Sequence, residues 1–531
     1  MIGLNIYTGI IKLSIALITY FVLTKVFSMK PGVIFIGELV ALGYCWCPTA
    51  LLYNYITYLL FTLAAIFICV AVKTEKLRYY FFAGICLGVN VFVRLPNIAE
   101  VCLIFAVWFY CVIKKTDFKS MLRITLVCIG GFASSIVIIL GIIAVTFGIK
   151  EYFSGVIEIL NMPQSASNYS LIEMIRGDIY IYSQNIKWLS IAAAVIIPGM
   201  ILFYLFKKQS RVVRWIAYIL INVVLVFIWH KMGLFEFTYY NYRSIENIGV
   251  FLLILSGLIS AYIMFFGGKD YVKRTVAAVS LIIILVSPLG SNNYLFSAFN
   301  NIFFVAPFTF STVYEYLEKT IKNKSDRSYK VIIEPMMLTV SFILVFASVQ
   351  GIAFGATFVF RDGISGEKRT ECVNDIDALV GMNTRAENAE QLRDLYQFIC
   401  DNELINSEVV LYGDIPGIAF SFHMTPAISS TWPDLDSYAV DKFTNELCRI
   451  ESGESTAELP IIILGINLDN QIEKQKILLD YIDKNGYTVV FENEKYILYQ
   501  SDMGIITDVQ PNTENDVDDS YDEEENLLTE A

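Results

Sequence analysis

Long apolar segments recur along residues 4–357, and they constrain this chain more than any other feature of its sequence. A run of about 20 apolar residues is long enough to cross a bilayer as a helix. Hydrophobic residues make up 56% of the chain and charged residues only 17%, which excludes an ordinary soluble protein. We predict an α-helical polytopic membrane protein with about twelve transmembrane helices. They lie near residues 4–24, 32–47, 50–72, 80–93, 98–113, 121–147, 188–206, 215–234, 249–266, 275–289, 301–317 and 333–357.

Lysine and arginine are distributed unequally between the loops that connect these segments. One alternating set of loops holds 21 of them and the other set holds 6. Because cytoplasmic loops carry the excess of positive charge, we predict that the richer set faces the cytoplasm and that residues 361–531 lie on the extracytoplasmic side. The same alternation puts Met1 outside without a signal peptide, which favours a natural protein that begins earlier, with at least one more helix.

Beyond residue 360 the sequence takes on the alternation of a soluble domain. We predict a small α/β domain over residues 361–505 and an acidic, disordered tail over 506–531. Its expected elements, in order, are a helix at 375–402, a strand at 408–414, a strand at 459–465, a helix at 470–484 and a hairpin at 487–500. No glycine-rich phosphate loop occurs, so nucleotide binding is not supported, and we expect no nucleic-acid partner.

One extracytoplasmic loop, residues 148–187, is too long for a simple connection. Its stretches 151–160 and 169–182 have amphipathic patterns. Such segments suit the membrane–water boundary, so we expect an interfacial loop here.

Two further outer loops are rich in tyrosine or asparagine. Residues 235–249 include Tyr239 and Tyr240, and residues 288–301 include Asn292 and Asn293 among other amides. An aromatic belt at the membrane surface explains the tyrosines as well as a binding role does, but it does not explain the asparagines.

Three segments resemble bacterial polytopic glycosyltransferases of the GT-C superfamily, which include protein mannosyltransferases and lipid A aminoarabinose transferases. They are "FFAGICLGVNVFVRLPNIAE" at 81–100, "PLGSNNYLFSAFNNIFFVAPF" at 288–308 and "VLYGDIPGIAFSFHMTPAISSTWPDLDSY" at 410–438. The resemblance implies an enzyme of the hexosyltransferase class at the outer face of a bacterial cytoplasmic membrane. It would transfer a sugar from a polyprenyl-phosphate lipid to a glycan, lipid or protein acceptor.

The resemblance also gives Arg94 a role. Arg94 stands between two apolar segments, and Leu95 and Pro96 end the helix there. We expect its guanidinium to bind the phosphate of the lipid donor, with Asn97 as an amide donor beside it. The alternative is that Arg94 only anchors the helix at the interface, where its charge reaches water.

Further residues are candidates for the substrate cavity on the same grounds. Arg243 is a second phosphate candidate. The candidates for lining the sugar and acceptor cavity are Tyr239, Tyr240, Asn292 and Asn293.

The catalytic carboxylate is less well defined. The family places an Asp or Glu in the first external loop, which this chain lacks, so Asp178 and Glu173 are the candidates for the acceptor base. The ten cysteines and the two histidines, His230 and His423, show no metal-ligand spacing, and we assign no metal ligands. A divalent metal ion remains open as a cofactor only through the resemblance.

Two other functional classes fit a chain of this kind. A lipid-linked saccharide transporter or flippase also has about a dozen helices, but it is expected to show an internal repeat that this sequence lacks. A non-catalytic membrane scaffold, as a truncated or inactive GT-C homologue, would retain the layout without the base.

The loop charges lead to a test of topology. An introduced cysteine at residue 434 should react with a membrane-impermeant maleimide in intact cells, whereas cysteines at residues 207–214 should react only after permeabilisation. Labelling of residue 434 only after permeabilisation would reverse the orientation and with it the extracytoplasmic chemistry.

Overall fold

The structure is a computed structural model in which the chain divides into two compact units, Met1–Arg393 and Asp394–Ala531. The division falls inside helix α15 (Ala386–Asp401), later in the chain than the domain boundary predicted near residue 360. The residues described are 2–45, 52–161, 171–239, 241–289, 294–322, 327–359, 362, 366–435, 438–454, 458–466 and 472–501.

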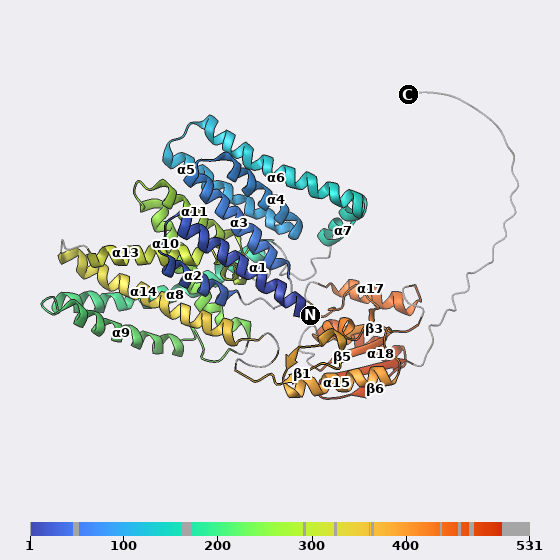
Figure 1. Ribbon diagram of the computed structural model, residues 1–531. Helices are drawn as coiled ribbons and strands as arrows, with labels where there is room; N and C mark the ends of the chain where they lie inside the picture. Colours follow the sequence, from blue (N-terminus) through green and yellow to red (C-terminus); the bar gives the residue numbers. More distant parts are fainter. Residues whose placement is uncertain are drawn as a thin grey trace, which may run out of the picture. The chain divides into compact units, whose positions relative to one another are not determined.

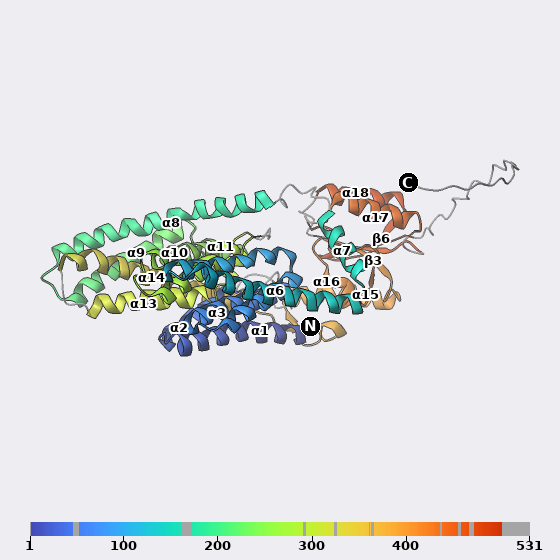
Figure 2. The ribbon, with the colours of Figure 1, turned by 90° about the horizontal axis from the view of Figure 1, so that it is seen from above.

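The first unit is a bundle of long helices (Figures 1 and 2). A helix occupies each of the apolar segments that the sequence predicts. Within the described residues, eight helices are long and apolar enough to cross a membrane, and α2 and α4 are shorter apolar helices. The polytopic helical architecture is therefore confirmed, while the count of twelve crossings stays a prediction.

The helices of this unit follow one another along the chain with short connections. They are α1 (Ile2–Phe21), the π-helix η1 (Val22–Val26), α2 (Pro31–Tyr44), α3 (Tyr53–Thr74), α4 (Leu77–Val93), the 3-10 helix η2 (Leu95–Leu103), α5 (Ile104–Lys114), α6 (Phe118–Thr146), α7 (Ile149–Asn161), α8 (Leu171–Leu205), α9 (Arg211–Lys231), the 3-10 helix η4 (Tyr242–Ile245), α10 (Glu246–Phe266), α11 (Tyr271–Val286), α12 (Phe296–Asn300), α13 (Val305–Lys322) and α14 (Arg327–Thr357).

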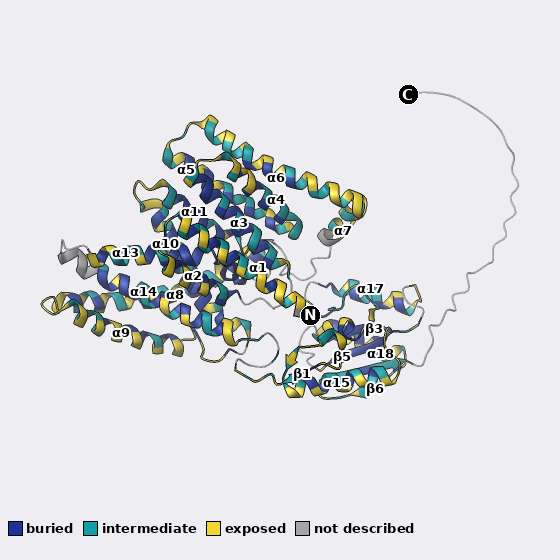
Figure 3. Ribbon diagram, viewed as in Figure 1, coloured by how far each residue is buried: buried dark blue, intermediate teal, exposed yellow. Residues whose placement is uncertain are grey.

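Burial distinguishes the centre of the bundle from its periphery (Figure 3). In α3, 72% of the most apolar stretch is buried, whereas in α6 the share is 17%. Because an apolar surface of this extent is stable only against lipid or another protein, the outer side of α6 must be covered by one of the two.

Small residues let α4 and α6 approach each other closely. A side chain at Gly84 would overlap the carbonyl oxygen of Cys128, and one at Gly131 would overlap that of Phe81. Backbone contact of this kind is a common means of helix association in lipid. It ties α4, and therefore the residues at its end, to the outer helix of the bundle.

Two helices cover much of the loop 148–187, whose position at the membrane–water boundary stays a prediction. The first amphipathic stretch is helix α7, as its pattern predicts. From Leu171 onward, however, the second stretch is the beginning of α8, which continues without interruption to Leu205. The amphipathic pattern indicates a helix with one buried side, and this stretch forms the first turns of the long helix α8. Residues 162–170 lie outside the described residues.

The second unit contains a five-stranded sheet with the order β4-β3-β5-β7-β6. A sheet of this kind agrees with the small α/β domain that the sequence predicts. The strands β3, β4 and β5 are parallel to one another, while β7 runs antiparallel to β5 and β6. The strands are β3 (Glu408–Tyr412), β4 (Thr425–Pro426), β5 (Ile461–Gly465), β6 (Tyr487–Glu492) and β7 (Tyr496–Ser501).

Helices α17 (Val440–Glu451) and α18 (Ile472–Lys484) share a hydrophobic core with β3 and β5. Phe443 and Leu478 from the two helices are buried in it, together with Val410 and Ile462 from the strands. The intervening strand residues are buried as well, so both faces of β3 and β5 are covered.

Two predictions for the chain beyond residue 360 were incomplete. The predicted helix at 375–402 is α-helical only from Ala386, because the 3-10 helix η5 (Asp377–Leu379) and the pairing of β1 (Glu371–Cys372) with β2 (Asn383–Thr384) precede it. Helix α17 was not predicted. Asp434 is buried, so the exposed native Cys448 is the better position for the labelling test of topology.

Glu446 on α17 connects this helix to the segment that follows β4. Its carboxylate accepts hydrogen bonds from the Ser429 amide at 2.9 Å, the Ser429 hydroxyl at 2.6 Å and the Tyr438 hydroxyl. Burial by itself raises the pKa of Glu446, but the hydrogen bonds from Ser429 and Tyr438 outweigh it and hold this pKa below its usual value of 4.5.

A carboxylate whose pKa is lowered by folding stabilises the folded state above its unfolded pKa, and this contribution is lost as the pH falls through the folded pKa. Glu446→Gln should therefore destabilise the second unit by about 1–3 kcal/mol near neutral pH. The difference from the wild type should shrink below about pH 4.5, where the wild-type carboxylate becomes protonated. Hydrogen exchange of the β3 and β5 amides in the full-length protein measures both the loss of stability near neutral pH and its decrease at low pH. A difference that stays constant over this pH range would contradict the argument.

Candidate functional site

Helix α4 ends at the residue that the sequence singles out. Arg94 has an extended backbone with φ −160° and ψ 124°, and the 3-10 helix η2 begins directly after it with Leu95 and Pro96. The proline has no amide hydrogen and fixes its own φ, so it can start the new helix but not continue the old one. The predicted break is present, and a 3-10 helix of nine residues follows it.

A network of buried polar side chains closes this break. Asn90 Nδ2 donates to Glu100 Oε2 at 2.5 Å, across the turn from α4 to η2. Asn97 Nδ2 donates to the Asn90 carbonyl at 3.0 Å and to Thr57 Oγ1 of α3 at 2.9 Å. Asn90, Asn97 and Glu100 are each at most 5% exposed. An apolar bundle contains such groups at low cost only when they are hydrogen-bonded, as they are here.

Arg94 borders this network. Its guanidinium lies 5.9 Å from the centre of the Tyr53 ring, within the range of a cation–π contact. Its charge also attracts the carboxylate of Glu100. Arg94 is partly exposed, whereas Glu100 is buried, so the guanidinium lies between the buried carboxylate and the surroundings of the bundle.

A second group of polar side chains lies at the same ends of the helices. The Tyr239 hydroxyl donates to Gln350 Oε1 at 3.0 Å, and the Tyr44 hydroxyl donates to the Ala347 carbonyl at 3.1 Å. All three side chains with these polar groups are buried. Tyr239 therefore contributes to the interior of the bundle, where its hydroxyl is held by α14.

The Thr62 hydroxyl of α3 donates to Asn301 Oδ1 at 3.2 Å, and both residues are buried. Thr62 is five residues beyond Thr57 on the same helix, so α3 connects the Arg94 network to the segment between α12 and α13. This segment belongs to the asparagine-rich stretch that the sequence marks at 288–308.

Asp178 on α8 is the buried carboxylate of the predicted pair. It is 7% exposed, and its Oδ1 has no hydrogen-bond partner among the described residues. The adjacent Gly177 packs so closely against the Tyr294 ring that a side chain there would overlap it. Asp178 is therefore brought next to the loop that precedes α12. Glu173 is instead only partly buried, and Arg176 pairs with it at 3.1 Å.

The remaining candidates are distributed as follows. Arg243 lies in the capping box of η4, with its guanidinium 5.9 Å from the Tyr242 ring and close enough to Glu246 to attract its carboxylate. Tyr240, Asn292 and Asn293 lie outside the described residues.

The structure brings Arg94 and Asn97 together and places Asp178 against the α12 loop. Sequence reasoning did not assign Asn90, Thr57 or Glu100 to the site. The signal was present for Glu100, because a carboxylate inside an apolar helix is rare unless it is paired or functional. Among the described residues, no group of three or more His, Cys, Asp or Glu side chains could hold a metal ion.

The Glu100 network allows a test of the break. Glu100→Leu removes one of the two acceptors of the buried Asn90 amide and leaves only the Thr57 carbonyl at 3.3 Å, so the protein should lose about 1–3 kcal/mol of stability. Glu100→Gln keeps a carbonyl acceptor and should lose less. Thermal unfolding in detergent measures the effect, with Ile98→Ala, a 60% exposed position on η2, as the control. A Glu100→Leu protein as stable as the wild type would show that the network does not stabilise the turn.

The comparisons with known proteins give little beyond this geometry. No protein-family model matches the sequence, and no curated protein matches it significantly. Among solved structures, the chain is similar to the oligosaccharyltransferase AglB from the archaeon Archaeoglobus fulgidus, in complex with an inhibitory peptide and a dolichol-phosphate, at 11% identity and a TM-score of 0.42. The match covers 96% of this chain and 64% of the AglB chain. A TM-score below 0.5 does not establish a shared fold, so this similarity assigns neither a family nor an activity to the chain.

Proposed function

We propose that this chain is a membrane glycosyltransferase that transfers a sugar from a polyprenyl-phosphate donor to an acceptor at the outer face of the cytoplasmic membrane. The observation that carries the proposal is the position of Arg94, a partly exposed guanidinium at the turn between the apolar helices α4 and η2, beside a hydrogen-bonded polar network. A polyprenyl phosphate has its tail in lipid and its charged group at the interface, and it needs a cation at this place.

Arginine suits this role because its planar fork matches the oxygen atoms of a phosphate. The network around it holds the turn in one conformation, so little side-chain and backbone freedom is lost on binding. The amide of Asn97 already donates to Asn90 and Thr57, and we therefore assign Asn97 to positioning Arg94 rather than to the phosphate itself.

The transfer needs a base for the acceptor hydroxyl. As the hydroxyl oxygen bonds to the anomeric carbon, its proton passes to a carboxylate, and the bond between the sugar and the phosphate breaks with both electrons going to the phosphate. We assign the base to Asp178, because its Oδ1 is buried, without a hydrogen-bond partner among the described residues, and next to the α12 loop. Arg94 stabilises the charge of the departing phosphate.

The experiment measures binding and transfer separately in nanodiscs. Arg94→Ala should weaken the affinity for a polyprenyl phosphate about 10- to 100-fold, because a charge-assisted contact contributes about 1.5–3 kcal/mol. The affinity of Arg94→Lys should lie between those of the wild type and Arg94→Ala, since lysine keeps the charge but lacks the planar guanidinium fork. Asp178→Asn should bind normally and release sugar from a labelled polyprenyl-phosphate donor about 10²- to 10⁴-fold more slowly.

Arg176→Ala is the matched control, because Arg176 is an exposed cation near the start of α8. Equal affinity for the wild type and both Arg94 variants would leave Arg94 as an interfacial anchor. A wild-type protein that binds the lipid phosphate but releases no sugar from any such donor would contradict the transferase assignment.

A further inference from the structure

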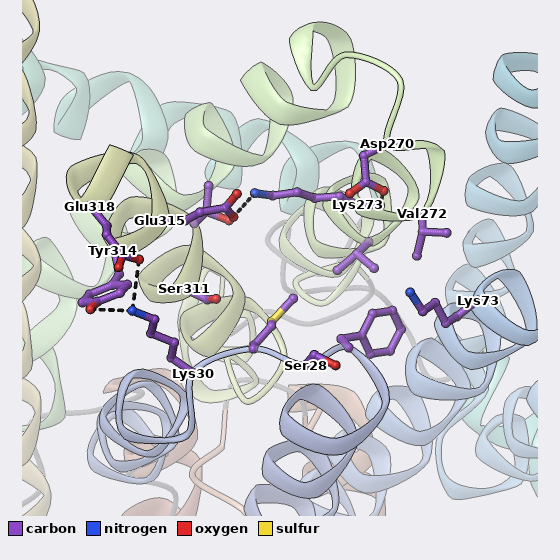
Figure 4. Close-up of a pocket in the computed structure, with 14 residues that line it drawn as sticks. Ser28, Lys30, Lys73, Asp270, Val272, Lys273, Ser311, Tyr314, Glu315 and Glu318 are labelled. Carbon is purple, nitrogen blue, oxygen red and sulfur yellow. Dashed lines mark hydrogen bonds and ion pairs between the residues drawn. The ribbon is translucent and has the colours of Figure 1, made fainter. Parts of the chain in front are cut away.

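A cavity of about 350 Å³ lies at the opposite ends of the same helices. It is formed where η1 meets α2 and where α3, α11 and α13 come together (Figure 4). Thr57 of the Arg94 network and Lys73 of the cavity are both on α3, sixteen residues apart, which separates them by about 24 Å along the helix axis. The cavity is thus distinct from the proposed transferase site, and the loop charges assign its face to the cytoplasm.

The cavity is lined by three lysines, Lys30, Lys73 and Lys273, and by three carboxylates. Two of the carboxylates are each neutralised twice. Glu315 pairs with Lys273 and with Lys319, the latter at 2.8 Å.

Glu318 pairs with Lys30 at 3.0 Å and with Lys322 at 2.6 Å. The third carboxylate, Asp270, accepts the backbone amide of Lys273 at 2.9 Å as the N-cap of α11. With the carboxylates paired in this way, the cavity and its rim have more cations than anions.

Lys73 is the lysine of the cavity that forms none of these ion pairs. Among the described residues it has no ion-pair partner, and Figure 4 shows its ammonium turned toward the cavity with no dashed line to a neighbour. A lysine in this setting is a point charge that is available to an anion.

A buried hydroxyl supports the same conclusion independently. Thr312 lines the cavity and is 3% exposed, and its Oγ1 has no hydrogen-bond partner among the residues that the structure describes. Buried hydroxyls normally have a partner, so a ligand in the cavity would satisfy it. Ser28 and Ser311 bring two more hydroxyls to the same space.

We infer that this cavity binds a phosphate group on the cytoplasmic side of the membrane. Lys73 supplies the charge, and the hydroxyl of Thr312 donates a hydrogen bond to a phosphate oxygen. A basic pocket between transmembrane helices on this side suits the headgroup of an anionic phospholipid of the inner leaflet. A soluble phosphate compound offers the same chemistry, and the volume lies within the range of about 300–1,000 Å³ that is typical of ligand sites.

The test uses the full-length protein in dodecyl maltoside, a detergent without phosphate, titrated with phosphatidylglycerol and followed by native mass spectrometry. Lys73→Gln should weaken binding about tenfold, as expected for the loss of a charge-assisted contact. Thr312→Val should weaken it several-fold. Neither Lys73 nor Thr312 belongs to the proposed transferase site, so a loss of binding in both variants separates the cavity from that site.

Lys76→Gln is the matched control, because Lys76 is exposed on the same face and does not line the cavity. Equal effects of Lys73→Gln and Lys76→Gln would show diffuse attraction and overturn the proposal, as would no effect of Lys73→Gln. A second titration with inorganic phosphate alone distinguishes the sources. Lys73-dependent binding of inorganic phosphate assigns the cavity to a soluble ligand, and Lys73-dependent binding of phosphatidylglycerol alone assigns it to a lipid.

Discussion

The hydrogen bonds of Asn97 hold the turn between α4 and η2 in place, and the position of Arg94 depends on this turn. A helix that stops inside an apolar bundle leaves its last carbonyl groups without partners, and lipid offers none. The Asn90 carbonyl accepts the Arg94 amide at 3.2 Å and also the Asn97 side-chain amide, and the same Asn97 side chain reaches Thr57 on α3. The break after α4 is thereby closed within the protein. Arg94 can then occupy an extended position between the two helices without an unsatisfied backbone beside it.

This arrangement explains why an arginine is tolerated at the boundary of two apolar segments. A lone guanidinium in hydrocarbon is costly, but Arg94 is partly exposed and has the Tyr53 ring on one side. The buried Glu100 side chain nearby accepts a hydrogen bond from Asn90. The site thus combines a partly exposed cation with a buried, hydrogen-bonded polar network beside it. In the cavity at the other ends of the helices, ion pairs neutralise Glu315 and Glu318, Asp270 caps α11, and Lys73 forms none of these pairs.

Much of the fold could be predicted from the sequence because lipid imposes a simple rule on the chain. Every apolar segment that crosses the membrane must be a helix, and a helix occupies each of the segments predicted between residues 4 and 357. Pro96 likewise marked the break, since its ring cannot continue α4. The hydrogen bond from Asn90 to Glu100 could not be predicted, because these residues are ten positions apart and meet only through the geometry of the turn. The continuation of the second amphipathic stretch into the long helix α8 could not be predicted either, because an amphipathic pattern indicates which side of a helix is buried but not how far the helix extends.

The glycines between α4 and α6 connect the site to the lipid-facing surface of the bundle. Gly84 and Gly131 hold the two backbones in contact, so α4 cannot move outward or inward without moving α6. Arg94 lies ten residues beyond Gly84 on the same helix, and its position along the membrane normal is therefore set by packing as well as by its own hydrogen bonds. On the other side, Asn97 ties the turn to α3, which is the most buried of the spanning helices. The turn that carries Arg94 is thus tied to α6 through α4 and to α3 through Asn97, and such a fixed position is what the phosphate site proposed for Arg94 requires.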